Sequence, residues 1–202
     1  MTTRTMLALV REPLTALGLR KRSGASFTME LAPDVIGWLG LNTASKYLPT
    51  GVVEVNPVVG VRHQTVERLI ADLRGEAFHA YLPPTVSISI GYVMPERCYV
   101  GWDVGEGRPE AVAELTAAVE RHGLPYMRRL VELPALCEAV EQRQSLRPEY
   151  QLPPIRLLLG RRNQALEGLA EDVKRLGDRQ DAAALELRSF AEAFARHVDA
   201  TS

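Results

Sequence analysis

The chain has few of the residues that commonly mark a metal site or a disulfide scaffold. Its 202 residues include 2 cysteines, Cys98 and Cys137, and 4 histidines. No two histidines fall within one helical turn and no Cys-x-x-Cys pair is present, so the spacing typical of a metal site is missing. Two separate thiols are typical of a protein in a reducing compartment. We therefore expect no bound metal, no cofactor and no disulfide framework.

An excess of charge of one sign and a long apolar run are also missing. The 24 Lys and Arg residues stand against 25 Asp and Glu, for a formal net charge of -1. This balance argues against nucleic acid as the main partner, because phosphate neutralisation dominates such binding, although a local basic patch stays possible. No segment approaches the ~18 apolar residues of a membrane span, and Arg11 and Glu12 break the apolar start before it resembles a signal peptide. We expect a cytoplasmic protein with no membrane partner, and the many Arg and Ala residues favour a bacterial source.

Motifs for nucleophilic catalysis and for phosphate binding are absent as well. No Gly-x-Ser-x-Gly sequence occurs, and Cys98 lies in an apolar strand pattern typical of a buried small residue. Residues 101–107 are rich in glycine, but they lack the Gly-Lys-Ser/Thr ending of a phosphate loop and contain Asp103 and Glu106, which would repel a phosphate. The sequence therefore predicts no catalytic residue.

The hydrophobic pattern predicts an α+β fold. Strands concentrate in the first half of the chain and helices in the second, which favours an antiparallel sheet over a parallel doubly wound one. We expect a sheet of about five strands covered by helices, followed by an all-helical C-terminal section. The expected strands are 26–31, 35–41, 51–57, 58–62 and 85–92, the last in a hairpin with 97–103; the expected helices are 7–18, 63–75, 109–123, 125–140 and two between 157 and 198.

The second half of the chain suggests a separate helical appendage. Residues 142–153 are polar and contain prolines, which indicates a linker or surface loop. We therefore expect an α+β core domain over residues 1–145 and a helical hairpin over 146–202, packed on that core. Residues 160–166 resemble the turn and second-helix start of a tetratricopeptide repeat, but a single unit favours a lone helical hairpin.

The basic run Arg20-Lys21-Arg22 is the main candidate for a binding site. Three adjacent cations in a predicted loop can meet phosphates or an acidic partner, or they can simply be solvated. Trp38 and Trp102 are possible aromatic anchors, since Trp and Arg are favoured in binding hot spots, and both are equally compatible with the core.

The start of the chain carries a resemblance to a known family. Residues 17–27 form a short helix end, a glycine, the basic run and a phenylalanine, and strand patterns follow at 35–42 and 53–57. Over residues 5–140 this order resembles domain-of-unknown-function family 4304, an uncharacterised bacterial family. The resemblance implies a fold and no site residues, because no activity is assigned to that family.

Three functions remain open from the sequence. The first is a non-enzymatic protein-interaction module, for instance in immunity or defence, that uses Arg20, Lys21 and Arg22. The second is an enzyme or nucleic-acid processing factor in which Asp103, Glu106 and His63 hold a cation. The third is a helical adaptor that forms a homodimer through the Leu and Phe stripes of residues 154–198.

Overall fold

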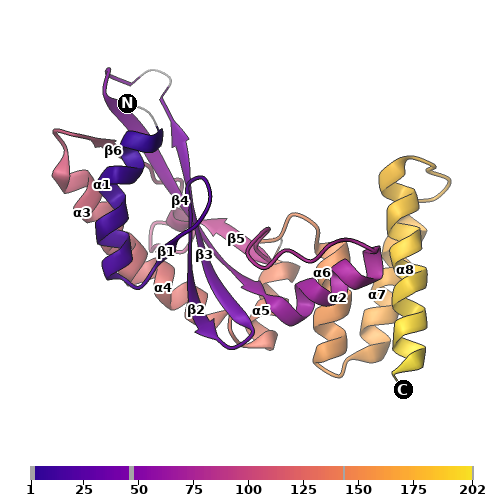
Figure 1. The fold of residues 1–202 in the computed structure, drawn as a ribbon. Helices are drawn as coiled ribbons and strands as arrows, with labels where there is room; N and C mark the ends of the chain where they lie inside the picture. The colour runs from indigo at the N-terminus through magenta and orange to yellow at the C-terminus, as the bar shows by residue number, and fades with distance from the viewer. Residues whose placement is uncertain (1–2, 46–47, 143, 202) are drawn as a thin grey trace. The chain divides into compact units, whose positions relative to one another are not determined.

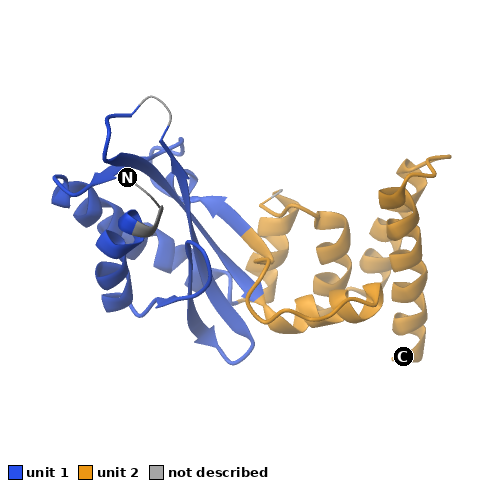
Figure 2. Cartoon of the chain, turned by 45° about the horizontal axis from the view of Figure 1, so that its top comes forward, with its two compact units in different colours: residues 1–62, 87–131 blue, residues 63–86, 132–202 orange. Residues whose placement is uncertain are grey.

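The computed structural model describes residues 3–45, 48–142 and 144–201. Within it the chain forms two compact units, the first of residues 1–62 and 87–131 and the second of residues 63–86 and 132–202 (Figure 2). The expected boundary between residues 145 and 146 therefore falls inside unit 2. The reason is tertiary: the helix that follows the fourth strand packs against the C-terminal helices, and no local pattern in the sequence reports that packing.

Unit 1 is an antiparallel sheet with helices, so the expected α+β class is confirmed (Figure 1). The strands lie in the order β1-β2-β3-β4-β5, and β6 pairs with β4. Figure 1 shows α1, α3 and α4 gathered on one side of these strands. The elements are α1 (Thr3–Ala16), β1 (Arg20–Lys21), β2 (Ser26–Ala32), β3 (Val35–Ala44), β4 (Val52–His63), β5 (Val86–Ser89), the 3₁₀ turn η1 (Ile90–Tyr92), β6 (Trp102–Gly105), α3 (Pro109–Ala118), the π-helical turn η2 (Val119–Gly123) and α4 (Leu124–Arg129).

Alternation along the strands decides which side chains enter the core of unit 1. Phe27 on β2 and Leu39 on β3 are register partners, and both side chains are fully buried. A methyl group built on Gly37 would lie 3.1 Å from Sδ of Met127, so this face of β3 packs against α4. Because successive strand residues point to opposite faces, the residues at even positions of β3 lie on the face away from α4.

Two strand predictions in unit 1 are wrong. The hairpin between residues 85–92 and 97–103 does not form, because β6 pairs with β4, where Trp102 lies opposite Val55. Cys98 is exposed rather than buried. Arg97 has a φ of 48°, and its N–H donates to the carbonyl of Met94 over 3.2 Å, so the chain turns where the pattern suggested a strand.

Unit 2 is a helical bundle. Its elements are α2 (Gln64–Arg74), α5 (Leu133–Glu141), α6 (Pro148–Leu158), α7 (Arg162–Arg175) and α8 (Ala182–Ala200). The expected helix after residue 63 is confirmed, and it ends at Gly75, whose φ of 65° provides the left-handed C-cap. The side chain of Asp181 caps α8 by accepting the Ala184 N–H over 3.2 Å.

The predicted linker at 142–153 is wrong over its C-terminal half, because α6 begins at Pro148. Proline is favourable at a first helical position because its missing N–H is not needed there. Pro153 and Pro154 lie further inside α6 and are buried with Tyr150 and Ile155, so packing keeps the helix despite two missing donors. Helix α6 then contacts α7 across the turn at Gly160, as expected for a helical hairpin.

The C-terminal apolar stripe lies inside unit 2. Phe190 packs edge-on against Tyr150, with ring centroids 4.9 Å apart, and stacks on Phe194 at 6.2 Å. The stripe that suggested a dimer is therefore covered within one chain. None of the helices in the described part of the chain combines the length and apolar composition needed to cross a bilayer.

Candidate interaction surface

The strand register and one hydrogen bond bring three of the candidate residues together. Arg20 on β1 lies opposite Thr28 on β2, and Thr28 lies opposite Trp38 on β3. Directly opposed residues of antiparallel strands share one face, with Cα atoms about 4.5–5.5 Å apart. The Arg22 Nε–H donates to Oγ1 of Thr28 over 2.8 Å. We call Arg20, Arg22, Thr28 and Trp38 the basic row.

The basic row lies on the face of the sheet away from α4. Trp38 follows Gly37, which faces Met127 of that helix, so the indole points the other way. Arg20 and Arg22 are exposed, and Trp38 is half-buried. Thr28 is only 2% exposed, so the arginines and the indole are the parts of the row that a partner could reach.

Lys21 does not belong to the basic row. It lies opposite the buried Phe27, and its Nζ sits 5.7 Å from the centroid of that ring. The ammonium also donates to the carbonyl of Arg22 over 2.5 Å. Burial, followed by the positive charge of Arg11, lowers the pKa of Lys21. The run of three cations is therefore divided between two faces, and Lys21 helps to hold the strand.

The indole ring of Trp38 lies along β3 and covers Gly40. A methyl group built on Gly40 would be only 2.3 Å from Cη2 of the indole, so the ring covers the glycine and depends on its lack of a side chain. The indole Nε1 is buried and has no hydrogen-bond partner in the described part of the chain. The donor of the ring is thus unused in this conformation.

Trp102 has a different environment from Trp38. It is 8% exposed and lies opposite Val55, next to the buried pair Val53 and Val104. It shares the face of these valines, which places it in the core of unit 1. The buried position of Trp102 therefore does not support the hypothesis that it is an aromatic anchor for a partner.

Carboxylates lie on the other face of β4 and β6. Asp103 is opposite Glu54 and forms an ion pair with Arg108 over 3.3 Å. Tyr99 donates its hydroxyl to Oε1 of Glu54 over 2.5 Å. That hydrogen bond, then burial and the negative charge of Glu54, raises the pKa of Tyr99.

The structure does not support the cation site that the sequence suggested for Asp103, Glu106 and His63. Across residues 3–45, 48–142 and 144–201, no three His, Cys, Asp or Glu side chains are grouped so that they could hold a metal ion. Glu106 is exposed in the turn after β6. His63 is buried at the end of β4, where its backbone N–H donates to Oγ1 of Thr85 over 2.9 Å.

Sequence reasoning missed an ordered loop that presents two tyrosines. Tyr92 is 50% exposed and Tyr99 is 56% exposed, at the two ends of the segment between η1 and β6. The buried Asn56 amide donates to Oγ of Ser89 over 2.8 Å and to the carbonyl of Val100 over 2.7 Å. These bonds hold both ends of the loop against β4. The sequence signal that could have found it is Met94-Pro95, which interrupts the strand pattern.

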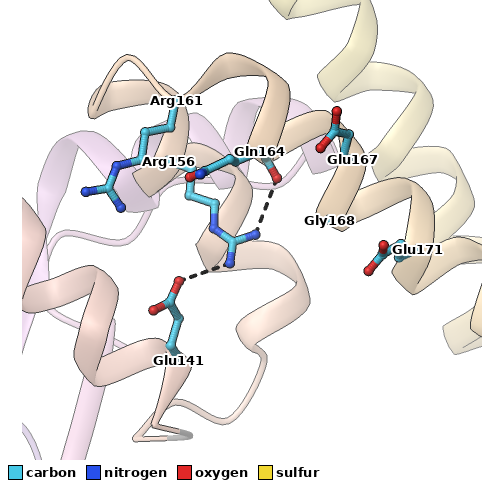
Figure 3. A pocket seen from close by; sticks show the side chains of 7 residues that line it. All are labelled: Glu141, Arg156, Arg161, Gln164, Glu167, Gly168 and Glu171. Atoms are coloured by element: carbon cyan, nitrogen blue, oxygen red, sulfur yellow. Dashed lines mark hydrogen bonds and ion pairs between the residues drawn. The ribbon is translucent and has the colours of Figure 1, made fainter.

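Unit 2 contains an open pocket of about 420 Å³ beside α7 (Figure 3). Arg156 reaches into it and donates to Glu141 over 3.0 Å and to the carbonyl of Gln164 over 3.4 Å. A methyl group on Gly168 would lie 2.6 Å from Nη1 of Arg156, so the glycine makes room for the guanidinium. The lining residues are Glu141, Arg156, Arg161, Gln164, Glu167, Gly168 and Glu171.

Two of the lining residues, Glu141 and Arg156, bind each other, and Glu141 also accepts a neighbouring thiol. Cys137 donates its thiol to Glu141 over 3.7 Å, and burial, followed by the charge of Glu141, raises the pKa of that thiol. Glu141 also forms an ion pair with Arg156, and Arg156 donates to a backbone carbonyl of α7, so these contacts connect α5, α6 and α7. These contacts therefore hold the three helices together.

The chain matches no family model, no curated protein and no solved structure. The resemblance of residues 5–140 to family 4304 stays a prediction.

Proposed function

We propose that unit 1 is a non-enzymatic protein-interaction module that contacts its partner through the basic row. The observation that supports this is the register Arg20–Thr28–Trp38, which places the exposed Arg20 and the half-buried indole on one face of the sheet, with the exposed Arg22 bonded to Thr28 between them. Arginine and tryptophan are the residue types most enriched in binding hot spots, because each combines a large contact area with specific hydrogen bonding. We also propose a cytoplasmic location and a role in immunity or defence.

The face of the sheet, rather than its edge, is the surface that fits this function. β1 is the edge strand, and it is only two residues long. Short edge strands with cationic side chains resist the addition of a further strand. A partner would therefore meet side chains of the basic row, and little of its affinity would come from backbone pairing.

The test compares two arginines of unit 1. The full chain, carrying a tag, would capture its partner from a nuclease-treated lysate of its source, and the purified pair would be titrated. We expect Arg20→Ala to raise Kd about 10-fold, as is typical when a hot-spot contact is truncated. Arg128 is also exposed but lies on α4, the helix on the opposite side of the sheet, so Arg128→Ala is the matched control and should change Kd less than 2-fold. Equal affinities for both variants and the wild type contradict the proposal.

A further inference from the structure

We infer that the basic row accepts a short, extended, acidic peptide segment in which an apolar side chain follows the acid by three residues. This inference rests on the proposed function and names the chemistry of the partner. It follows from the spacing, the charge and the unused donor of the row.

The spacing of the row sets the length of the segment. Arg20 and Trp38 are separated by two inter-strand steps, which amounts to about 10 Å. In a polyproline II segment, residues i and i+3 point to the same side and lie about 9 Å apart. One such segment, lying across β1, β2 and β3, therefore places its first side chain near Arg20 and its fourth over Trp38.

The charge of the row selects a carboxylate for the first position. Arg20 and Arg22 are two residues apart in the same strand region, and the guanidinium group matches a carboxylate in planar, bidentate geometry. The side chain at the other end of the row is an indole, so the fourth position of the segment is apolar.

Acidic side chains on the same face limit the length of the ligand. Glu30 lies two residues beyond Thr28 on β2, is exposed, and therefore shares the face of the row. Glu54 and Asp103 occupy the corresponding face of β4 and β6. A nucleic acid, which carries a phosphate at every nucleotide, would meet these carboxylates, whereas a segment of four residues need not.

The indole N–H of Trp38, which has no partner among the described residues, is available to donate a hydrogen bond to the bound segment. Nε1 of Trp38 is buried while the ring covers Gly40, so the ring must turn before it can donate. A bound peptide offers carbonyl acceptors beside the ring, and an unpaired buried donor is unfavourable enough to be relieved by one. Binding should therefore change the environment of this N–H directly.

The test is an NMR titration of the ¹⁵N-labelled full chain with synthetic peptides. The chain has 2 tryptophans, so its indole region should contain two signals, which Trp38→Phe assigns. The probe is a blocked peptide containing Glu-Pro-Pro-Leu, and its control, Glu-Leu-Pro-Pro, has the same composition with the two side chains adjacent. We expect the Trp38 signal to shift with a Kd on the order of 1 mM, the Trp102 signal to stay in place, and the control peptide to bind at least 3-fold more weakly.

Further variants and probes separate the outcomes. Arg20→Ala should raise the Kd for the Glu-Pro-Pro-Leu peptide at least 3-fold. Equal binding of the two peptides, a shift of Trp102 alone, or tighter binding of a single-stranded DNA dodecamer overturns the inference. If no peptide binds while Arg20→Ala still weakens the captured protein partner, the acidic-segment inference is wrong and the interaction function stands. If Arg20→Ala leaves both unchanged, both proposals fail.

Discussion

Gly91 is the position in unit 1 where one added methyl group should do most damage. A Cβ built there would lie 2.1 Å from the carbonyl oxygen of Cys98 and 3.0 Å from the backbone nitrogen of Val100. Both are backbone atoms, so no side-chain rotation relieves the overlap. In Gly91→Ala the backbone at Cys98 and the backbone at residue 91 must therefore separate by about 1.3 Å, the difference between the built 2.1 Å and the 3.4 Å at which ordinary contacts begin.

The cost follows from what that movement breaks. Asn56 is buried, and its amide holds the carbonyl of Val100 over 2.7 Å, so displacement of the segment removes this hydrogen bond. Leaving a buried polar group unsatisfied costs about 1–3 kcal/mol, and overpacking adds about 1–3 kcal/mol. We expect Gly91→Ala to lower the free energy of unfolding of unit 1 by about 2–6 kcal/mol.

Urea unfolding followed by tryptophan fluorescence measures this effect. Both tryptophans belong to unit 1, so the signal reports that unit rather than the helical one. Gly107 is the matched control, because a Cβ there meets nothing within 4 Å, and Gly107→Ala should stay within about 0.5 kcal/mol of the wild type. A Gly91→Ala protein as stable as this control would refute the reasoning about the contact with Cys98.

Three further predictions concern stability and reactivity. Glu186→Ala should lower the stability of unit 2 by about 1–2 kcal/mol in thermal unfolding followed by circular dichroism, because Glu186 pairs with Arg74, whose side chain is only 14% exposed. Burial raises the pKa of Tyr126 to about 12, so the unfolded chain loses this proton first and stability should fall by roughly 2–3 kcal/mol between pH 10 and pH 12. A thiol reagent should modify Cys98 rapidly and Cys137 only on unfolding, because Cys137 is buried and its pKa is raised.

Each of these predictions has a matched control. Asp199→Ala removes an exposed partner of Arg162 and should change stability by less than about 0.5 kcal/mol. Tyr126→Phe should remove the part of the alkaline decline that this hydroxyl causes, and an unchanged profile would contradict the assignment. Cys98→Ser should abolish the fast phase of thiol modification; a remaining fast phase would mean that Cys137 is accessible.

The fold class could be predicted because strand and helix periods are local. The helix of residues 64–74 follows from one apolar face and a terminal glycine, and the strands at 26–32 and 35–44 follow from alternation. The grouping into two units could not be predicted in the same way. Helix α2 belongs with α6 and α8 because it packs against them, and such contacts join residues more than 80 positions apart.

The segment before β6 shows how a local pattern fails. Apolar residues alternate around Cys98, yet Arg97 adopts a positive φ and the chain turns. What decides this is the tertiary pairing of β6 with β4, together with the hold of Asn56 on Val100. Alternation reports that a segment could form a strand, but the available partner strand determines whether it does.

The candidate site could not be predicted from the sequence for a related reason. Arg20 and Trp38 were both named from residue type alone, but only the register of three strands places them on one face. The same register removes Lys21 from the set, because adjacent strand residues point in opposite directions. A shift of one residue in either pairing would have reversed both results.

The basic run also protects the edge of the sheet, and this second role can be separated from partner binding. A charged, two-residue edge strand prevents edge-to-edge association whatever the sign of its charge. Arg20→Glu should therefore keep the protein soluble in light scattering, whereas its affinity for the partner should fall further than in Arg20→Ala, because the carboxylate of the partner would now meet a like charge. If Arg20→Glu binds as well as the wild type, the arginine serves the edge alone and the face of the sheet is not the docking surface.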